Sequence, residues 1–242
     1  MNWTSVRQVF IKDFQELTKN RYVFFSMLFL PVLIVGISIF DIYTAVTSSS
    51  PASTIATLVE TFSTIIILIP AIVSVLIGCT SVVIEKNNRS LEPLLATPIT
   101  DTELLVGKAL TPFAPAMILG YAAYGAIIPA VDYLTFPVLG MYVLPTPMLL
   151  YQMFVMAPLI GLFGTFVALF ISTKIKDVRA AQQVSMLSVM PLFFLLIIGT
   201  LILASISDLL IVVTVILIFA VVGFAWLTIK QFNRESILIS WK

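Results

Sequence analysis

The sequence predicts an all-α integral membrane protein with six transmembrane helices. Of its 242 residues, 60% are hydrophobic and only 10% are charged, whereas roughly a quarter of the residues in a soluble domain are charged. Thirteen Lys and Arg and 12 Asp and Glu cannot cover the surface of a water-soluble domain of this length. Six apolar stretches account for the excess of hydrophobic residues. Each is long enough to cross a bilayer, because a transmembrane helix needs about 20 mainly apolar residues. They cover residues 22–46, 61–84, 109–131, 148–172, 183–204 and 209–229.

The composition excludes several classes of function. The chain contains no His and a single Cys, Cys79, which excludes imidazole catalysis, histidine-based metal sites and an internal disulfide. The net charge of +1 suggests no nucleic-acid surface. From the second predicted span onward, the span interiors contain no Asp, Glu, Lys or Arg. A proton relay, an intramembrane enzyme and a metal site are therefore not expected.

The basic residues predict the orientation of the chain in the membrane. All 13 Lys and Arg lie before the first span, between spans two and three, between spans four and five, or after the sixth. Because basic residues collect in cytoplasmic segments, both termini are predicted to be cytoplasmic in a multi-pass protein of the plasma membrane. The opposite side carries only acidic residues, namely Asp41, Glu60, Asp132 and Asp208.

An amphipathic helix is predicted over residues 3–20, lying in the inner membrane interface. Apolar side chains recur at three- and four-residue spacing, and polar side chains occupy the other side. This helix is either a simple anchor before the first span or a lever that moves with a cytoplasmic partner. The apolar positions are Val6, Val9, Phe10, Phe14 and Leu17, and the polar positions are Arg7, Lys12, Asp13, Glu16 and Lys19.

The segment 85–108, between the second and third spans, carries the most information about function. Leu91, Leu94 and Leu95 fall on one helical face, and Pro93 and Pro98 limit the helix. A short rigid helix with a leucine knob and flanking charges fits a groove on another protein. The alternative is a solvated connector that returns the chain to the membrane.

This segment resembles the signature of permease subunits of type-2 ABC exporters. The family pattern has a Glu, a helix with paired leucines, a Thr-Pro-Ile sequence, a polar turn and a Glu followed by Gly-Lys. In this chain Arg89 and Ser90 stand where Gly and Thr are common. The matching residues are Glu85, Leu91, Glu92, Leu94, Leu95, Thr97, Pro98, Ile99, Glu103, Gly107 and Lys108.

The resemblance implies that segment 85–108 contains a coupling helix that docks on a cytoplasmic ATPase. Leu94 and Leu95 would be the inserted knob, and the loop with Lys174, Lys176 and Arg179 would be a secondary contact. Two copies of the chain and two ATPase subunits would form the exporter, with the substrate path between the copies. The remaining docking residues would be Glu85, Arg89, Leu91, Glu92, Thr97 and Pro98.

No nucleotide site is expected in this chain. A phosphate-binding loop requires Gly-x-x-x-x-Gly-Lys followed by Ser or Thr. At the Gly107-Lys108 pair, Thr102 stands at the first Gly position and Ala109 at the hydroxyl position. The chain itself is therefore predicted to be no enzyme and to hold no cofactor, with ATP and Mg²⁺ bound by the partner subunit.

Two other functions remain open at this stage. A stand-alone secondary transporter or channel would move its substrate along an ion gradient without ATP. A non-transporting membrane scaffold would bind partners without stimulating an ATPase. The sequence indicates no substrate-binding residues.

Small residues in the fourth span permit a close approach of another helix. Gly161, Gly164 and Ala168 recur at spacings that place them near one face of a helix. Such residues let two helix backbones approach closely. Such residues are common, and the pattern does not identify a dimer face.

Overall fold

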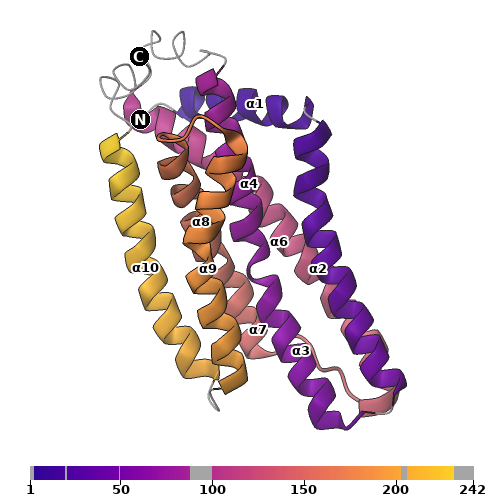
Figure 1. The fold of residues 1–242 in the computed structure, drawn as a ribbon. Helices are drawn as coiled ribbons and strands as arrows, with labels where there is room; N and C mark the ends of the chain where they lie inside the picture. Colours follow the sequence, from indigo (N-terminus) through magenta and orange to yellow (C-terminus); the bar gives the residue numbers. More distant parts are fainter. Residues whose placement is uncertain (1–2, 20, 49, 88–99, 203–205, 232–242) are drawn as a thin grey trace.

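The computed structural model is a bundle of long helices (Figure 1). It describes residues 3–19, 21–48, 50–87, 100–202 and 206–231. Among these residues, six helical segments are long and apolar enough to cross a membrane, which confirms the predicted helical class and number of spans. The elements are α1 (Trp3–Lys19), α2 (Arg21–Thr47), α3 (Ala52–Ile66), α4 (Ile69–Asn87), α6 (Asp101–Leu139), α7 (Pro147–Tyr151), a π-helical turn (Gln152–Met156), α8 (Ala157–Ser172), α9 (Val178–Ile202) and α10 (Ile206–Gln231).

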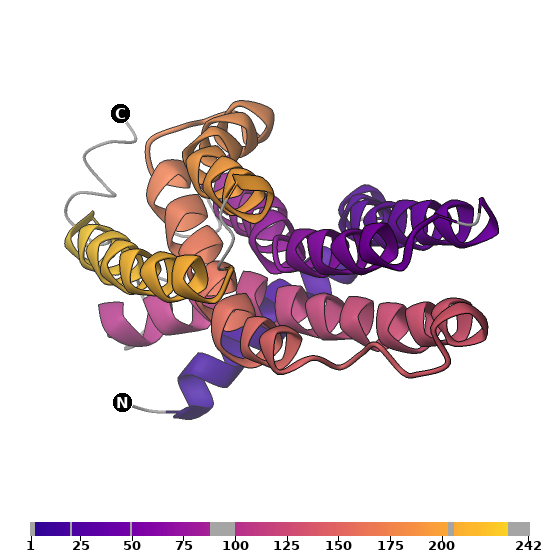
Figure 2. The same ribbon diagram turned by 90° about the horizontal axis from the view of Figure 1, so that it is seen from below.

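One helix lies across the bundle and the others run along it. Helix α1 crosses one end, and the end of α4, the start of α6 and the end of α10 lie at this same end (Figure 1). Helices α2 and α10 occupy opposite sides, as the view along the bundle also shows (Figure 2). Helix α4 packs against α8 and α6 and is buried along most of its length. Helices α2 and α10 keep largely exposed apolar surfaces, which is what a lipid-facing helix presents.

Two helices extend into the segment that the sequence assigned to a loop. The predicted boundaries followed the charges of Glu85 and Lys108, but α4 continues to Asn87 and α6 already begins at Asp101. A charged residue ends an apolar stretch of sequence, yet it does not end a helix when its charge finds a partner inside the protein. The described part of segment 85–108 is therefore mostly helix.

The second span also begins earlier than predicted and consists of two helices. Helices α3 and α4 are separated by a turn at Ile67 and Leu68. Pro70 follows this turn and has no backbone N–H to continue the helical hydrogen bonds. On the facing helix α6, a Cβ added to Gly120 would lie 2.7 Å from Cγ of Pro70. The absence of a side chain at Gly120 therefore lets α6 pass close to the interruption.

The first residue of α6 is set by a cap. The N–H of Glu103 donates to the hydroxyl of Thr100 (3.4 Å), and the N–H of Thr100 donates to the carboxylate of Glu103 (3.1 Å). This reciprocal pair satisfies backbone donors that the first turn leaves free. It places Lys108 two turns into the helix, because each turn takes about 3.6 residues.

The small residues of the fourth span allow α8 to approach α4 closely. A Cβ added to Gly164 would lie 2.7 Å from the backbone oxygen of Ala71, which is closer than real Cβ atoms approach. One turn further, the Cβ of Ala168 would lie 2.9 Å from a Cβ added to Gly78. Helices α4 and α8 therefore form the tightest backbone contact described here, at the centre of the bundle.

Replacing Gly164 with Ala is expected to destabilise the protein, because the added methyl group meets the backbone of α4. Overpacking of this kind costs about 1–3 kcal/mol. The matched control is Gly36→Ala, where an added Cβ meets nothing within 4 Å. Thermal unfolding in detergent should show a lower midpoint for Gly164→Ala only. Equal midpoints for the two variants would contradict the close α4–α8 contact.

Candidate functional site, a buried charge cluster

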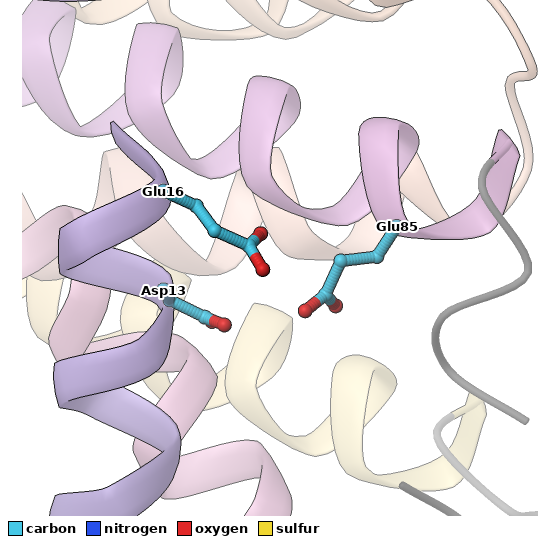
Figure 3. Close-up of side chains that lie close together, drawn as sticks. All are labelled: Asp13, Glu16 and Glu85. Carbon is cyan, nitrogen blue, oxygen red and sulfur yellow. The ribbon is translucent and has the colours of Figure 1, made fainter. Parts of the chain in front are cut away.

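Four charged residues from three helices meet at the end of the bundle that α1 crosses. They are termed the charge cluster and comprise Lys12 and Asp13 of α1, Glu85 of α4 and Lys108 of α6. The Lys108 ammonium donates to Asp13 Oδ2 (2.8 Å) and to the carboxylate of Glu85. The Lys12 ammonium donates to Glu85 Oε1 (3.0 Å). Figure 3 shows the carboxylates of Asp13 and Glu85 pointing toward each other from α1 and α4.

The centre of the charge cluster is closed to solvent. The side chains of Lys108, Asp13 and Glu85 are 0%, 1% and 2% exposed. An unpaired charge in such surroundings is very unfavourable, whereas one that is paired and hydrogen-bonded is tolerated. One helical turn before these residues, their own helices contribute to a small apolar core. This core contains Val9, Val82, Leu104, Leu105 and Leu169.

Polar and half-exposed groups complete the surroundings of Asp13. The hydroxyls of Ser81 and Thr111 lie 3.5 Å from Asp13 Oδ2, at the limit of hydrogen bonding. Its other oxygen, Oδ1, has no hydrogen-bond partner among the described residues. Lys12 is 37% exposed and also lies 3.8 Å from the carboxylate of Glu16, which is half exposed. The charge cluster is thus closed to solvent at Lys108 and partly exposed to solvent at Lys12.

Helix α1 reaches the charge cluster because one residue of α6 has no side chain. A Cβ added to Gly107 would lie 2.9 Å from Cβ of Val9 and 3.3 Å from the backbone oxygen of Val6. The backbone of α6 at Gly107 therefore packs directly against the side chain of Val9 in α1. Asp13 follows Val9 by one turn, and Lys108 follows Gly107 directly, so the contact brings the two charges together.

The environment of Asp13 favours its protonated form. Burial raises the pKa of its carboxyl, Lys108 opposes that effect, and the nearby Glu85 raises the pKa further, to about 6. For Lys12, partial burial lowers the pKa, but the charge of Glu85, the hydrogen bond to it and the charges of Glu16 and Asp13 together raise the pKa above its ordinary value. The two α1 residues therefore respond to Glu85 in the same direction and both retain protons more strongly.

A metal ion does not fit the charge cluster well. Carboxylate oxygens of Asp13, Glu16 and Glu85 lie within 4.8 Å of one another, a spacing that could suit a cation. However, the ammonium groups of Lys12 and Lys108 already donate to two of these carboxylates. A metal ion would face two fixed positive charges at contact distance. The arrangement is an ion-pair network between helices.

Comparison with known protein families identifies the chain. A family described as ABC-2 family transporter protein matches residues 7–216, which include the first five spans, the beginning of the sixth and the whole charge cluster. This chain is an ABC-2 family membrane protein. No curated protein matches it. As an ABC-2 permease component, it is a multi-pass membrane protein.

Of the predicted docking residues of this ABC-2 permease, the structure describes Glu85. Its carboxylate faces Lys108 and Lys12 inside the protein and is nearly inaccessible to solvent. In this arrangement Glu85 holds the end of α4 in place, and its contact with an ATPase stays a prediction. The other predicted docking residues lie outside the described residues, namely Arg89, Leu91, Glu92, Leu94, Leu95, Thr97 and Pro98.

The predicted secondary docking residues lie in and beside the loop between α8 and α9. Lys174, Lys176 and Arg179 are exposed, and the ammonium of Lys174 lies 4.4 Å from the centre of the Phe170 ring. The loop is next to the last turn of α4, because Asn87 donates to the backbone oxygen of Lys176. The structure thus brings the beginning of the predicted coupling segment and the secondary loop side by side.

The sequence analysis missed two of the central residues. It assigned Asp13 to the solvated side of the N-terminal helix, which is wrong, because Asp13 is buried together with Val6 and Val9. It assigned Lys108 to a loop, whereas Lys108 lies buried inside α6. One feature of the sequence was consistent with the charge cluster. Acidic and basic residues lie next to the apolar stretches on the same predicted side of the membrane, where they could pair. This feature does not specify which charges pair.

Replacing Lys108 with Met is expected to lower stability strongly, because Asp13 and Glu85 lose their shared partner. Breaking a buried ion pair from one side typically costs about 3–5 kcal/mol. The matched control is Lys12→Met, which removes the half-exposed lysine of the same cluster. Unfolding in detergent should rank wild type, Lys12→Met and Lys108→Met in decreasing stability. A Lys108→Met variant as stable as Lys12→Met would contradict the central role of Lys108.

Asp13 is expected to make stability pH-dependent in a defined direction. Its carboxyl has a pKa of about 6 in the folded protein, against an ordinary value of 3.8. Between these values the folded state binds the proton more tightly than the unfolded state, so stability falls as the pH rises through this window. In Asp13→Asn, unfolding midpoints measured from pH 4 to pH 7 should lose this component. The prediction fails if the two proteins show the same dependence on pH.

Proposed function

We propose that this ABC-2 protein is the membrane-spanning permease of an ATP-driven exporter. Two copies would form the substrate path, and two cytoplasmic ATPase subunits would supply the energy. Family membership and the six apolar helices support a transport role in a membrane. ATP and Mg²⁺ would bind to the ATPase, because the only Gly-Lys pair in the sequence lacks the residues of a phosphate-binding loop.

The observation that carries the proposal is the pairing of Glu85 with Lys108. Glu85 lies in the last turn of α4, and Lys108 lies in the second turn of α6. These are the two helices that flank the predicted coupling segment, so the buried ion pair joins its two ends. A force on the segment would then act on α4 and α6 together.

The charge cluster also favours the lever interpretation of the N-terminal helix. Asp13 and Lys12 attach α1 to the same ion pair, and Gly107 lets α1 pack directly on α6. Helices α1, α4 and α6 would move as one unit at the cytoplasmic end. Because α4 is buried and packs on α8, such a movement would reach the centre of the bundle.

The position of α1 agrees with the proposed membrane orientation. It lies across the end of the bundle at which α4 ends, α6 begins and α10 ends, each of them next to a predicted cytoplasmic segment (Figure 1). Trp3, Ile11 and Phe14 are exposed on it, and a helix in the membrane interface would place such side chains among the lipids. Both termini would then face the cytoplasm.

The charge cluster does not favour a stand-alone ion-driven carrier. Such carriers place titratable groups along a path near the middle of the membrane. Here the buried charges lie beside α1, at the end of the bundle, and pair with one another. They hold helices together instead of lining a route across the protein.

The tagged protein, purified gently from its native membrane, is expected to carry an ATPase with it. Replacing Leu94 and Leu95 together with Asp should remove the ATPase, because charged side chains would not enter an apolar groove. The matched control is Thr102→Asp, which adds an acidic charge at the exposed first turn of α6, where acidic residues are favourable. ATPase activity and stoichiometry in the purified samples are the measurements.

The outcomes separate the possible functions. Loss of the ATPase from the leucine variant but not from Thr102→Asp would support the proposed docking. If well-folded wild-type protein carries no ATPase, the exporter proposal fails, and a stand-alone carrier or a scaffold becomes the better interpretation.

A further inference from the structure

The loop between α8 and α9 is held by the end of α4. The ammonium of Lys86 donates to the backbone oxygen of Thr173 (2.8 Å), and the side-chain amide of Asn87 donates to the backbone oxygen of Lys176 (3.2 Å). Lys86 and Asn87 are the last two residues of α4. The residue after them begins the part of the predicted coupling segment that lies outside the described residues.

Two more hydrogen bonds fix the same loop, one to α10 and one at the start of α9. The hydroxyl of Thr173 donates to the side-chain oxygen of Gln231 in α10 (3.0 Å). The N–H of Arg179 donates to the carboxylate of Asp177 (2.8 Å), which satisfies a backbone donor at the start of α9. Contacts with α4 and α10 therefore hold the loop in a defined conformation.

Three further polar contacts connect α4 to the first turns of α9. The side-chain amide of Gln182 donates to the hydroxyl of Thr80 (3.2 Å) and to the backbone oxygen of Leu76 (3.3 Å). One turn deeper, the sulfur of Cys79 and the hydroxyl of Ser185 lie 3.3 Å apart. Together with Lys86 and Asn87, these contacts form a row along α4 that faces the loop and α9.

Such contacts have a mechanical consequence inside a membrane. The contacts of Cys79 and Gln182 are buried or half-buried, and polar groups in such surroundings are costly to separate from their partners. The contacts of Lys86 and Asn87 extend this row to the exposed end of α4. Lys86 in addition places a positive charge at the C-terminal end of α8, where the helix dipole favours it. A displacement of the end of α4 should therefore carry the loop and the start of α9 with it.

We infer that Lys86 and Asn87 are positioning residues that make the two cytoplasmic connections move as one unit, and that this unit drives the cytoplasmic half of α9. The inference rests on the proposed function, since the displacement of α4 would come from the docked ATPase. It adds a route from the coupling segment to α9 that is separate from the charge cluster, which leads to α1 and α6.

The test measures a nucleotide-dependent movement of α9. Gln183 is exposed near the start of α9 and lines a groove on this helix with Arg179 and Met186. A Gln183→Cys reporter is placed in a Cys79→Ser background, which removes the native thiol and keeps a polar partner for Ser185. The rate of maleimide labelling is measured on the purified complex with its ATPase, with and without a non-hydrolysable ATP analogue.

The reporter should change its labelling rate when the analogue binds, and the double variant Lys86→Met/Asn87→Leu should lose this response while the ATPase stays bound. The matched control is Lys230→Met, which removes a neighbouring cytoplasmic lysine that lies over the Trp226 ring instead of in the row. A short thiol crosslink between Asn87→Cys and Lys176→Cys should preserve the response, because these positions are expected to stay together.

Several results would overturn the inference. They are a reporter that never responds although the ATPase is bound, a double variant that responds like its parent, and a crosslink that abolishes the response until it is reduced. Absence of any ATPase from the folded parent protein would instead overturn the proposed function. A melting temperature measured on each sample shows that the compared proteins are equally folded.

Discussion

The arrangement of the end of the bundle that α1 crosses depends on one buried ammonium group. Lys108 has no access to water, so its charge is compatible with the fold only while Asp13 and Glu85 accept its hydrogen bonds. Each of these three residues comes from a different helix. The cost of leaving any one of them unpaired therefore fixes the relative positions of α1, α4 and α6, which apolar packing alone would permit to slide.

The helical class and the number of spans follow from the sequence, because they depend on local composition. The apolar stretches are long, and a helix is the conformation that satisfies every backbone group of a single span within lipid. The ends of the helices follow less directly. The apolar pattern stops at Glu85 and resumes after Lys108, and it could not reveal that these two charges pair and allow both helices to continue.

The charge cluster could not be predicted from the sequence, because its members are far apart in the chain. Asp13 and Lys108 are separated by 95 positions, and helical periodicity in α1 is compatible with Asp13 on either edge of the apolar face. What decides the question is Gly107, which lets α1 approach α6 closely enough to bury a carboxylate. A glycine before a lysine appears in sequence as part of a family motif, and its structural reason emerges only when α1 is placed against it.

The structure gives the end of α4 two kinds of attachment, and they differ in strength for a physical reason. Toward α6, Glu85 makes a buried ion pair that is costly to break, and toward α1 it pairs with the half-exposed Lys12 next to the buried Asp13–Lys108 pair. Such pairs suit helices that stay together throughout a transport cycle. Toward the loop and α9, Lys86 and Asn87 make hydrogen bonds to backbone oxygens near the surface, where water can replace a lost partner. The second attachment is therefore the weaker of the two at its outer end, and it is reinforced by the deeper contacts of Gln182 and Cys79. In an ATP-driven permease, α1, α4 and α6 would then act as the input unit, and the contacts of α4 with the loop and α9 would stay closed while they pass movement to the rest of the bundle.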